Sequence, residues 1–210
     1  MIKVLVADDH EVVRRGLRQI LAETGDILVA AEAGSASDVM KHVREQRFDV
    51  VVLDISLPGG SGIELIGEIK KLRPETRVLI LTVYSEEQYA VRAIRAGAAG
   101  FLTKESASDR LIEAVRKIAA GGRYVTAELA ETLASLLAGE SVGQPHERLS
   151  DREFEILKLL ASGKTVSQVA QELSLSVKTV STHRTRILKK MNMKTNAELT
   201  HYAVRNGLVQ

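Results

Sequence analysis

The chain has 210 residues, of which 45% are hydrophobic and 3% aromatic, and its 29 Lys and Arg against 27 Asp and Glu leave a formal net charge of +2. This length suits one large domain or two small ones, and the absence of cysteine excludes disulfides and Cys-type zinc sites while fitting a reducing cytosol. The sequence shows no signal-peptide pattern and no apolar run near the roughly 18 residues that a membrane span needs, so we expect a cytoplasmic protein with no membrane partner.

Residues 1–121 alternate short apolar runs with amphipathic segments. The runs predict buried strands at Ile2–Ala7, Ile27–Ala31, Val50–Leu53, Val78–Leu81 and Gly100–Leu102. The segments between and after them predict helices at Val12–Glu23, Ala36–Arg47, Ile63–Leu72, Glu87–Ala96 and Asp109–Ala120. Successive β–α units predict a five-stranded parallel sheet with helices on both faces, a flavodoxin-like doubly wound α/β fold.

Five polar residues stand at or just beyond the carboxyl ends of these strands: Asp8, Asp9, Asp54, Thr82 and Lys104. Because those ends meet at one edge of a parallel sheet, we expect the five side chains to converge. Crowded carboxylates repel one another unless a cation neutralises them, and oxygen-only ligands favour Mg²⁺. With its charge screened, Asp54 can act as a nucleophile towards a phosphoryl group that Lys104 and Thr82 would hold. One acidic residue at a strand end is usually a solvated loop residue, but five such positions together favour a site.

These residues lie in stretches that resemble the receiver domain of bacterial two-component response regulators. The matching stretches are V-A-D-D-H (6–10), V-V-L-D-I-S-L-P (51–58), G-I-E-L (62–65), I-L-T (80–82) and A-G-A-A-G-F-L-T-K (96–104). The resemblance implies that a sensor histidine kinase donates its phosphoryl group to Asp54, the phosphoacceptor. It also implies a Mg²⁺ cofactor on Asp9, Asp54 and the backbone carbonyl of Ser56, with Asp8 contributing through water.

The resemblance also assigns a switch. Lys104 would pair with the phosphoryl group, Thr82 would move towards it, and Phe101 would swing into the vacated space while otherwise serving as a core aromatic. Two departures are that Phe101 replaces the commoner Tyr, keeping the ring, and that Glu105 replaces the Pro found after the lysine in many receivers.

Two further residues, Ser56 and Tyr84, each stand two positions beyond a site residue. By resemblance they would flank the water that hydrolyses the acyl phosphate and so tune dephosphorylation. An alternative function is that of a haloacid dehalogenase-type phosphate-ester hydrolase, but Ser56 stands where such enzymes need an Asp, and no cap domain follows. We therefore expect a regulator that supports its own phosphotransfer and dephosphorylation rather than a dedicated enzyme.

A linker with one helix is expected over 122–147, between a receiver at 1–121 and a helical domain at 148–210. Gly121-Gly122 ends the receiver, and Thr126 caps a helical pattern over Ala127–Ala138. The stretch Gly139–His146, with its Gly, Ser and Pro, predicts a flexible tether.

Residues 149–210 predict four helices and no strand. The expected caps are Ser150 with Glu153, Thr165 with Gln168, Ser176, Thr195 with Glu198, and Gly207 at the last carboxyl end. Two short helices on either side of Ser174-Leu175-Ser176 predict a helix-turn-helix. Residues 145–210 carry 11 Lys or Arg and 6 Asp or Glu, a balance of +5, whereas 1–144 have a balance of −3. The asymmetry indicates that only the second part meets nucleic acid.

The helix after Ser176 has two faces at about 100° per residue. Val180, Arg184, Ile187 and Met191 form the inward stripe, and Lys178, Ser181, Thr182, Thr185 and Lys189 form the outward face. Small hydroxyls between lysines suit a DNA major groove, with Arg184 laying its stem on the core and sending its guanidinium to a phosphate. The expected DNA-binding residues are Lys178, Thr179, Ser181, Thr182, His183, Arg184, Thr185, Arg186 and Lys189. A solvated surface face is the alternative for each of them.

This segment resembles the LuxR-type helix-turn-helix, and the whole chain resembles the NarL/FixJ class of response regulators. The residues responsible are L-S-D-R-E (149–153), G-K-T-V-S-Q-V-A (163–170), L-S-L-S-V-K-T-V-S-T-H (173–183) and I-L-K-K-M (187–191). The resemblance implies regulation of transcription by double-stranded DNA binding, an active homodimer joined through Ala197–Asn206, and RNA polymerase as a further candidate partner. A stand-alone signalling protein whose helical module binds protein is the rival from another class.

The tether also predicts a switch between the domains. The helical module can fold back with Ser181, Thr182 and Thr185 hidden until phosphorylation favours an open, dimerising state.

Overall fold

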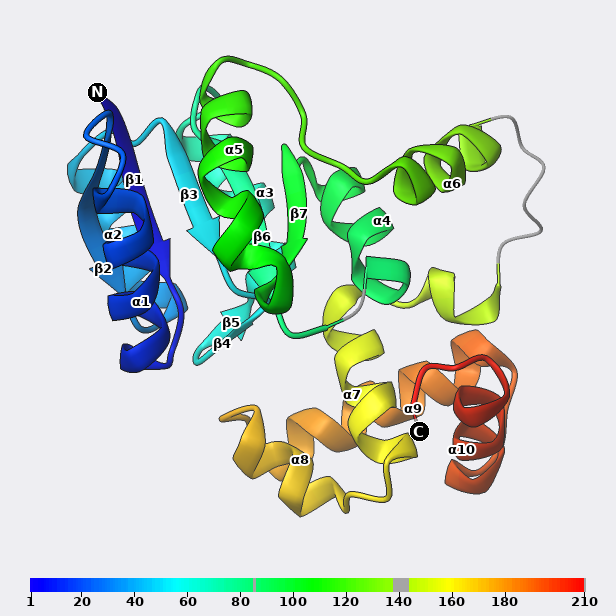
Figure 1. Cartoon of the computed structure of the whole chain (residues 1–210). Coiled ribbons are helices and arrows are strands. Elements are labelled where there is room, and N and C mark those ends of the chain that lie inside the picture. The colour runs from blue at the N-terminus through cyan, green and yellow to red at the C-terminus, as the bar shows by residue number, and fades with distance from the viewer. Residues whose placement is uncertain (85, 138–143, 210) are drawn as a thin grey trace. The chain divides into compact units, whose positions relative to one another are not determined.

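The computed structural model describes residues 1–84, 86–137 and 144–209 and divides the chain into two compact units, Met1–Ala138 and Gly139–Gln210 (Figure 1). Most of the predicted tether, residues 139–143, lies outside the described residues. Among those described, no helix is long and apolar enough to cross a membrane.

The amino-terminal unit is built on a parallel sheet. Its strands are β1 (Ile2–Ala7), β2 (Ile27–Ala33), β3 (Val50–Leu53), β6 (Arg77–Thr82) and β7 (Gly100–Thr103), in the order β2-β1-β3-β6-β7. The predicted five-stranded sheet is therefore confirmed, with one or two residues added to β2, β6 and β7. The strand order reverses between β1 and β3, and in such sheets the crevice at the carboxyl ends beside that reversal binds ligands.

Helices cover both faces of the sheet. Helices α1 (Glu11–Ala22) and α5 (Ala107–Ala119) lie on one face, and α2 (Ala36–Glu45), α3 (Gly62–Leu72) and α4 (Glu86–Ala96) lie on the other (Figure 1). Alternate strand residues face opposite sides, so Val4 and Val6 of β1 join Leu17 of α1 and Leu111 of α5 in one buried core. Helix α2 ends at Glu45, before the predicted Arg47, because the backbone of the following residue is already extended.

Two short elements beside the sheet were not predicted. Strands β4 (Ser56–Leu57) and β5 (Gly60–Ser61) form an antiparallel hairpin, and a 3₁₀ turn covers Lys104–Ser106. The hairpin returns the chain so closely that a Cβ at Gly62 would collide with the carbonyl oxygen of Asp54. Only a glycine fits there, and the fold-back holds Ser56 beside Asp54.

The segment after α5 extends the sheet beyond β7. Tyr124 forms a parallel bridge with Gly100: its amide donates to the carbonyl of Ala99 at 2.9 Å, and its carbonyl accepts from the amide of Phe101 at 3.1 Å. A Cβ at Gly100 would lie 2.7 Å from the Tyr124 carbonyl oxygen, so this close approach needs a glycine. Helix α6 (Ala127–Leu137) follows and packs on α4, and the predicted cap is confirmed because the Thr126 hydroxyl accepts from the Leu129 amide at 3.2 Å.

The described residues of the carboxy-terminal unit form helices joined by turns and no strand, as predicted. A 3₁₀ turn (Pro145–Arg148) precedes α7 (Asp151–Ala161), α8 (Val166–Glu172), α9 (Val177–Met191) and α10 (Asn196–Arg205). Val180, Ile187 and Met191 of α9 are buried against a core that includes Phe154 and Leu199, which confirms the inward stripe apart from the half-buried Arg184.

The caps follow the sequence with one correction. Ser150 with Glu153 and Thr165 with Gln168 form capping boxes, and Ser176 accepts from the Thr179 amide. The predicted third capping box is wrong in one half: Thr195 caps α10, but the Glu198 carboxylate accepts from the Lys194 amide at 2.9 Å instead of the Thr195 amide. Gly207, with a φ of 65°, ends α10 in the left-handed conformation as expected.

Candidate functional site

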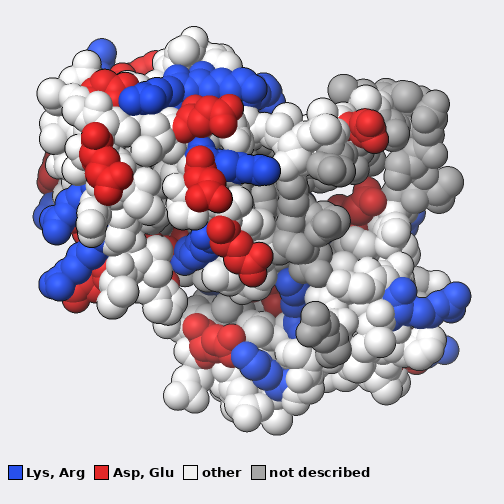
Figure 2. Space-filling model, viewed as in Figure 1, with Lys and Arg blue, Asp and Glu red and all other residues white. Residues whose placement is uncertain are grey.

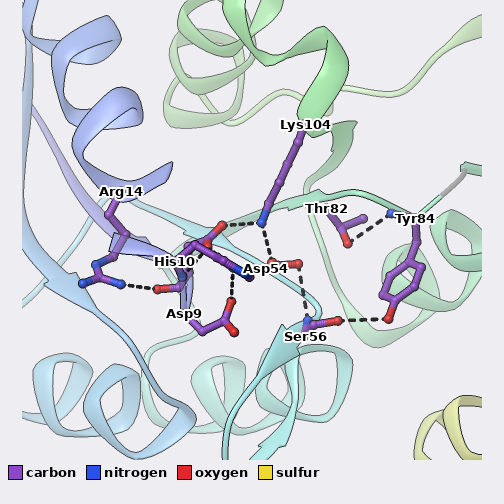
Figure 3. Close-up of polar contacts among 9 residues, drawn as sticks. Asp9, His10, Arg14, Asp54, Ser56, Thr82, Tyr84 and Lys104 are labelled. Atoms are coloured by element: carbon purple, nitrogen blue, oxygen red, sulfur yellow. Dashed lines mark hydrogen bonds and ion pairs between the residues drawn. The ribbon is translucent and has the colours of Figure 1, made fainter. Parts of the chain in front are cut away.

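The carboxyl ends of β1 and β3 bring two buried carboxylates together under one lysine. Asp8 and Asp54 directly follow strands that pair side by side, and their side chains are only 2% and 3% exposed. The Lys104 Nζ lies 2.5 Å from Asp8 Oδ2 and 2.7 Å from Asp54 Oδ2, as Figure 3 shows for the bond to Asp54. One cation therefore serves two buried anions.

The charges in this site are not balanced by the protein. Burial raises the pKa of Asp54 above its usual value, and the nearby Asp8 adds to the rise, although Lys104 opposes it. Burial lowers the pKa of Lys104, but its bonds to both carboxylates outweigh burial and leave that pKa raised. Lys104 is thus held protonated, and Asp54 is costly to ionise without further positive charge.

Asp9 supplies a third carboxylate on the more open side of the site. Its side chain is 33% exposed, and the ligand atoms of Asp8, Asp9 and His10 all lie within 4.8 Å of one another. Clustered carboxylate oxygens beside a charge deficit are the donors that Mg²⁺ takes. The residues present therefore fit a divalent cation.

Two residues near Asp8 were given no role by the sequence analysis. His10 donates its amide to Asp8 Oδ1 at 2.9 Å, and its Nδ1 lies 2.7 Å from Asp9 Oδ1. Arg14 donates from Nη1 to the carbonyl of Asp8 at 2.7 Å (Figure 3). Its Nε lies 3.5 Å from Glu32 Oε2. Both positions belong to the first turns after β1, which is the available sequence signal, but their contacts depend on how that turn folds.

Ser56 and Tyr84 close the other side of Asp54. The Ser56 amide donates to Asp54 Oδ1 at 3.3 Å, and the Ser56 hydroxyl donates to the Tyr84 hydroxyl at 3.2 Å (Figure 3). The Tyr84 ring lies 4.7 Å, centroid to centroid, from the ring of buried Tyr89 on α4, a neighbour that the sequence analysis missed. The two loops after β3 and β6 are thus joined across the site.

Two of the remaining receiver positions, Thr82 and Phe101, are buried. Thr82 is fully buried, and its hydroxyl oxygen accepts from the Tyr84 amide at 3.4 Å (Figure 3). Phe101 is 1% exposed on β7 and belongs to the core. Glu105 is exposed in the 3₁₀ turn.

In the carboxy-terminal unit, α9 carries the predicted outward face. Lys178, Ser181, Thr182, Thr185, Arg186 and Lys189 are exposed, and Thr179, His183 and Arg184 are half-buried. Arg184 donates from Nε to Asn196 Oδ1 at 2.6 Å and so ties α9 to α10. That bond uses one of the five N–H donors of the guanidinium, and the phosphate contact of Arg184 stays a prediction.

Charge on the amino-terminal unit is mixed. Figure 2 shows its basic and acidic side chains interspersed over the visible face. The excess of basic over acidic residues lies in residues 145–210, whereas residues 1–144 have a small acidic excess.

Comparison with known proteins finds relatives along the whole chain. Residues 4–116 match the family "Response regulator receiver domain", and residues 147–203 match "Bacterial regulatory proteins, luxR family". The "Response regulator UvrY" of Escherichia coli (strain K12) is 37% identical over 209 residues, covering 99% of this chain and 96% of that one.

Solved structures of RcsB have the same architecture. RcsB of Salmonella enterica serovar Typhimurium, bound to promoter rprA with phosphomimetic BeF3-, has a TM-score of 0.66 and 25% identity over 96% of this chain and 97% of that one. A structure of two RcsB dimers on two parallel DNAs has a TM-score of 0.60 and 25% identity over 97% of this chain and 98% of that one.

Proposed function

This chain belongs to the NarL/FixJ class of two-component response regulators, which join a receiver to a LuxR-type DNA-binding domain, and we propose that phosphorylation of Asp54 by a sensor histidine kinase controls its dimerisation and its sequence-specific binding to DNA. The observation that carries the proposal is Lys104 bridging Asp8 and Asp54 at the strand ends. Proteins of this family are not normally dedicated enzymes, and the chemistry proposed here is confined to one phosphoryl group on the protein itself.

In the proposed transfer, an Asp54 oxygen attacks the phosphorus of the donor while the bond from phosphorus to the kinase histidine breaks. Asp9, Asp54 and the Ser56 carbonyl would hold Mg²⁺, with Asp8 contributing through water, and the ion would offset the negative charge that gathers on the phosphoryl oxygens. Lys104 is already 2.7 Å from Asp54, so its ammonium can follow the charge onto the phosphoryl group. Thr82 would then donate its hydroxyl to that group, and Phe101 would move into the space left behind.

The contacts of Ser56 also bear on the hydrolase alternative. A hydrolase with an aspartyl nucleophile needs a general acid at position 56, and the Ser56 hydroxyl instead donates to Tyr84. A serine bonded in this way protonates no leaving group at neutral pH. The regulator is therefore the better-supported function.

For the second unit, the proposed DNA-binding residues are those of the exposed α9 face together with Thr179, His183 and Arg184. By resemblance to the family, α10 is the proposed dimer contact, and an open groove lined by Met193, Ala197, Glu198, His201 and Tyr202 among others runs along it. The similarity to RcsB structures that contain DNA supports DNA rather than a protein as the partner. The test is to measure the affinity of the chain for a DNA duplex at increasing salt concentration. A steep fall in affinity would indicate DNA binding, because counterions are released from the DNA phosphates.

The phosphoacceptor is tested with the isolated chain. We expect acetyl phosphate with Mg²⁺ to add one phosphoryl group to the folded protein, as measured by intact mass, because the receiver itself holds the transfer site. Asp54→Asn is the matched variant and should give no adduct. An unmodified wild-type chain, or an adduct that persists in the variant, would contradict the assignment.

A further inference from the structure

The two threonines at the centre of the exposed α9 face have their hydroxyl hydrogens already in use. Thr182 Oγ1 donates to the carbonyl of Lys178 at 2.9 Å, and Thr185 Oγ1 donates to the carbonyl of Ser181 at 3.1 Å. Both are bonds to the carbonyl four residues earlier in the helix, a common arrangement for threonine in helices. Both side chains are exposed.

A threonine hydroxyl carries one hydrogen, so while these bonds are made neither side chain has a donor left for a base. What each still presents is its methyl group and an oxygen lone pair. The guanine edge in the major groove offers two acceptors, N7 and O6, and gives these threonines nothing to bond. The thymine edge offers a methyl group, and its partner adenine offers the N6 donor.

The rest of the outward face does not replace the missing donors with a purine-reading amide. The described residues of α9, Val177–Met191, include no Asn or Gln, and Arg184 commits its Nε to Asn196. Arg186 is exposed and can contact a phosphate or a guanine beside the threonines. Lys178 and Lys189 flank the threonines as exposed cations suited to phosphates. Ser181 differs from its threonine neighbours, since it has no methyl group and no bond that commits its hydroxyl among the described residues.

We propose that Thr182 and Thr185 determine specificity by packing their methyl groups against the 5-methyl groups of thymine, so that the half-site has thymine at the positions beneath them. The inference rests on the proposed DNA-binding function. Each methyl contact removes apolar surface from water. Losing one such contact returns the surface of about one carbon group to water, which weakens binding about fourfold.

The test begins by finding a site. The full chain, treated with acetyl phosphate and Mg²⁺, is used to select duplexes from a random-sequence pool, and affinity is measured for the selected site. Each thymine is then replaced singly by deoxyuridine, which removes only the 5-methyl group. At least two such replacements per half-site should weaken binding about fourfold each.

Paired variants locate the protein side of the contact. T182S and T185S keep the hydroxyl and lose the methyl, so each should weaken binding to the thymine site and lose sensitivity to one deoxyuridine position. T182V and T185V keep a methyl and lose the hydroxyl, so each should retain the affinity and the sensitivity. Ser162→Ala, at an exposed position outside the proposed DNA-binding residues, is the control and should leave the ratio of thymine to uracil affinities unchanged. Circular dichroism checks that every variant is folded.

The outcomes are distinguishable. If no duplex is bound by any form of the chain, the proposed function fails and this inference with it. If a site is bound but every deoxyuridine replacement is neutral, or the serine variants keep full sensitivity, the methyl readout is wrong while DNA binding stands. Loss of affinity in the valine variants with no loss in the serine variants would assign recognition to the hydroxyls.

Discussion

At the scale of single residues, the distribution of charge around Asp54 governs both stability and chemistry. Two carboxylates less than a tenth exposed share one ammonium, and the pKa of Asp54 is raised because burial disfavours its ionised form. Such a site holds an anion that the fold alone does not fully compensate. The electrostatic cost of this site falls when a cation binds or when one of the two carboxylates is removed.

We therefore expect Asp54→Asn to unfold at a higher temperature than the wild type in Mg²⁺-free buffer, with a gain of about 1–3 kcal/mol. Thermal melts followed by circular dichroism measure it. Adding Mg²⁺ should stabilise the wild type more than the variant and narrow the gap. A variant that is less stable than the wild type without Mg²⁺ would show that Lys104 already compensates both carboxylates.

The lifetime of the phosphorylated state is a second property set by single residues. Tyr84 spans the site to Ser56 and is supported by the ring of Tyr89. Its bulk should hinder the water that attacks the acyl phosphate, so Tyr84→Ala should shorten the half-life several-fold, as measured by loss of the phosphorylated mass over time.

Tyr84→Phe is the matched control for that prediction. It keeps the ring and removes only the hydroxyl that accepts from Ser56. A half-life near that of the wild type would assign the effect to bulk, and a half-life equal to that of the alanine variant would assign it to the hydrogen bond. Equal decay in all three proteins would remove Tyr84 from the list of tuning residues.

Residues at strand ends were predictable, whereas their supports were not. Asp8, Asp54 and Lys104 could be grouped because parallel strands end at a common edge. His10, Arg14 and Tyr89 could not, because their contacts depend on turn geometry and on side-chain direction across the sheet. Their residue types alone would equally suit a solvated helix.

At the scale of elements, α7 and α9 are joined by a buried acid. Glu153 closes the capping box of α7 and also accepts from Lys190 Nζ of α9 at 2.6 Å. Burial raises the pKa of Glu153, but the bonds from Lys190 and from Ser150 outweigh it and leave the pKa below its usual value of 4.5. The same side chain therefore starts one helix and anchors another.

The pH dependence follows from that direction. A carboxyl whose pKa is lower in the folded state contributes stability that is present above pH 4.5 and is lost as pH falls through the lower folded value. We expect Glu153→Gln to cost about 1 kcal/mol at pH 7, because Lys190 is partly exposed and solvent screens the pair. The cost should shrink towards pH 3, as scanning calorimetry of the intact chain can show.

Lys190→Met is the control for this prediction, because it removes the ion pair and keeps the capping box. It should reproduce part of the loss at pH 7 and weaken the acid dependence. A loss in the glutamine variant that is the same at pH 3 and pH 7 would show that the carboxylate charge is not involved.

Long elements were predictable from periodicity, but small ones were not. Apolar runs located β1 and β3 to the residue, and caps at Ser150 and Thr165 placed the helix starts. The hairpin of β4 and β5 has two residues in each strand, too few to show alternation. The Glu198 carboxylate accepts from the Lys194 amide and not from the expected Thr195 amide, and sequence spacing alone does not distinguish the two.

At the scale of the whole molecule, two domains and their order could be predicted because the hydrophobic pattern changes from alternating runs to helices alone. The end of the amino-terminal unit lies later than the predicted residue 121, since Tyr124 and α6 belong to that unit. Backbone pairing of Tyr124 could not be predicted, because R-Y-V at 123–125 is too short to distinguish from a loop.

The proposed masking of α9 belongs to this scale. The comparison uses the site selected above and three proteins: the intact chain, the phosphorylated intact chain, and a fragment from Gln144 onward. Masking requires the fragment and the phosphorylated chain to bind at least about tenfold more tightly than the unmodified chain, which is about 1.4 kcal/mol of difference. If phosphorylation strengthens binding but the fragment is no better than the unmodified chain, receiver-driven dimerisation alone is the mechanism. Calorimetry of the fragment establishes that it is folded.

The bridge between Gly100 and Tyr124 has a consequence for how such proteins can be recombined. The receiver does not finish at α5, because residues after it complete the sheet on the side of β7 and bond the amide of Phe101. A chimera that exchanges receivers at residue 121 would pair β7 with a foreign segment or leave an open sheet edge, which invites aggregation. A junction placed after α6 would carry the native edge along with the domain. The modular unit that can be transferred between regulators is therefore the receiver together with Tyr124 and α6.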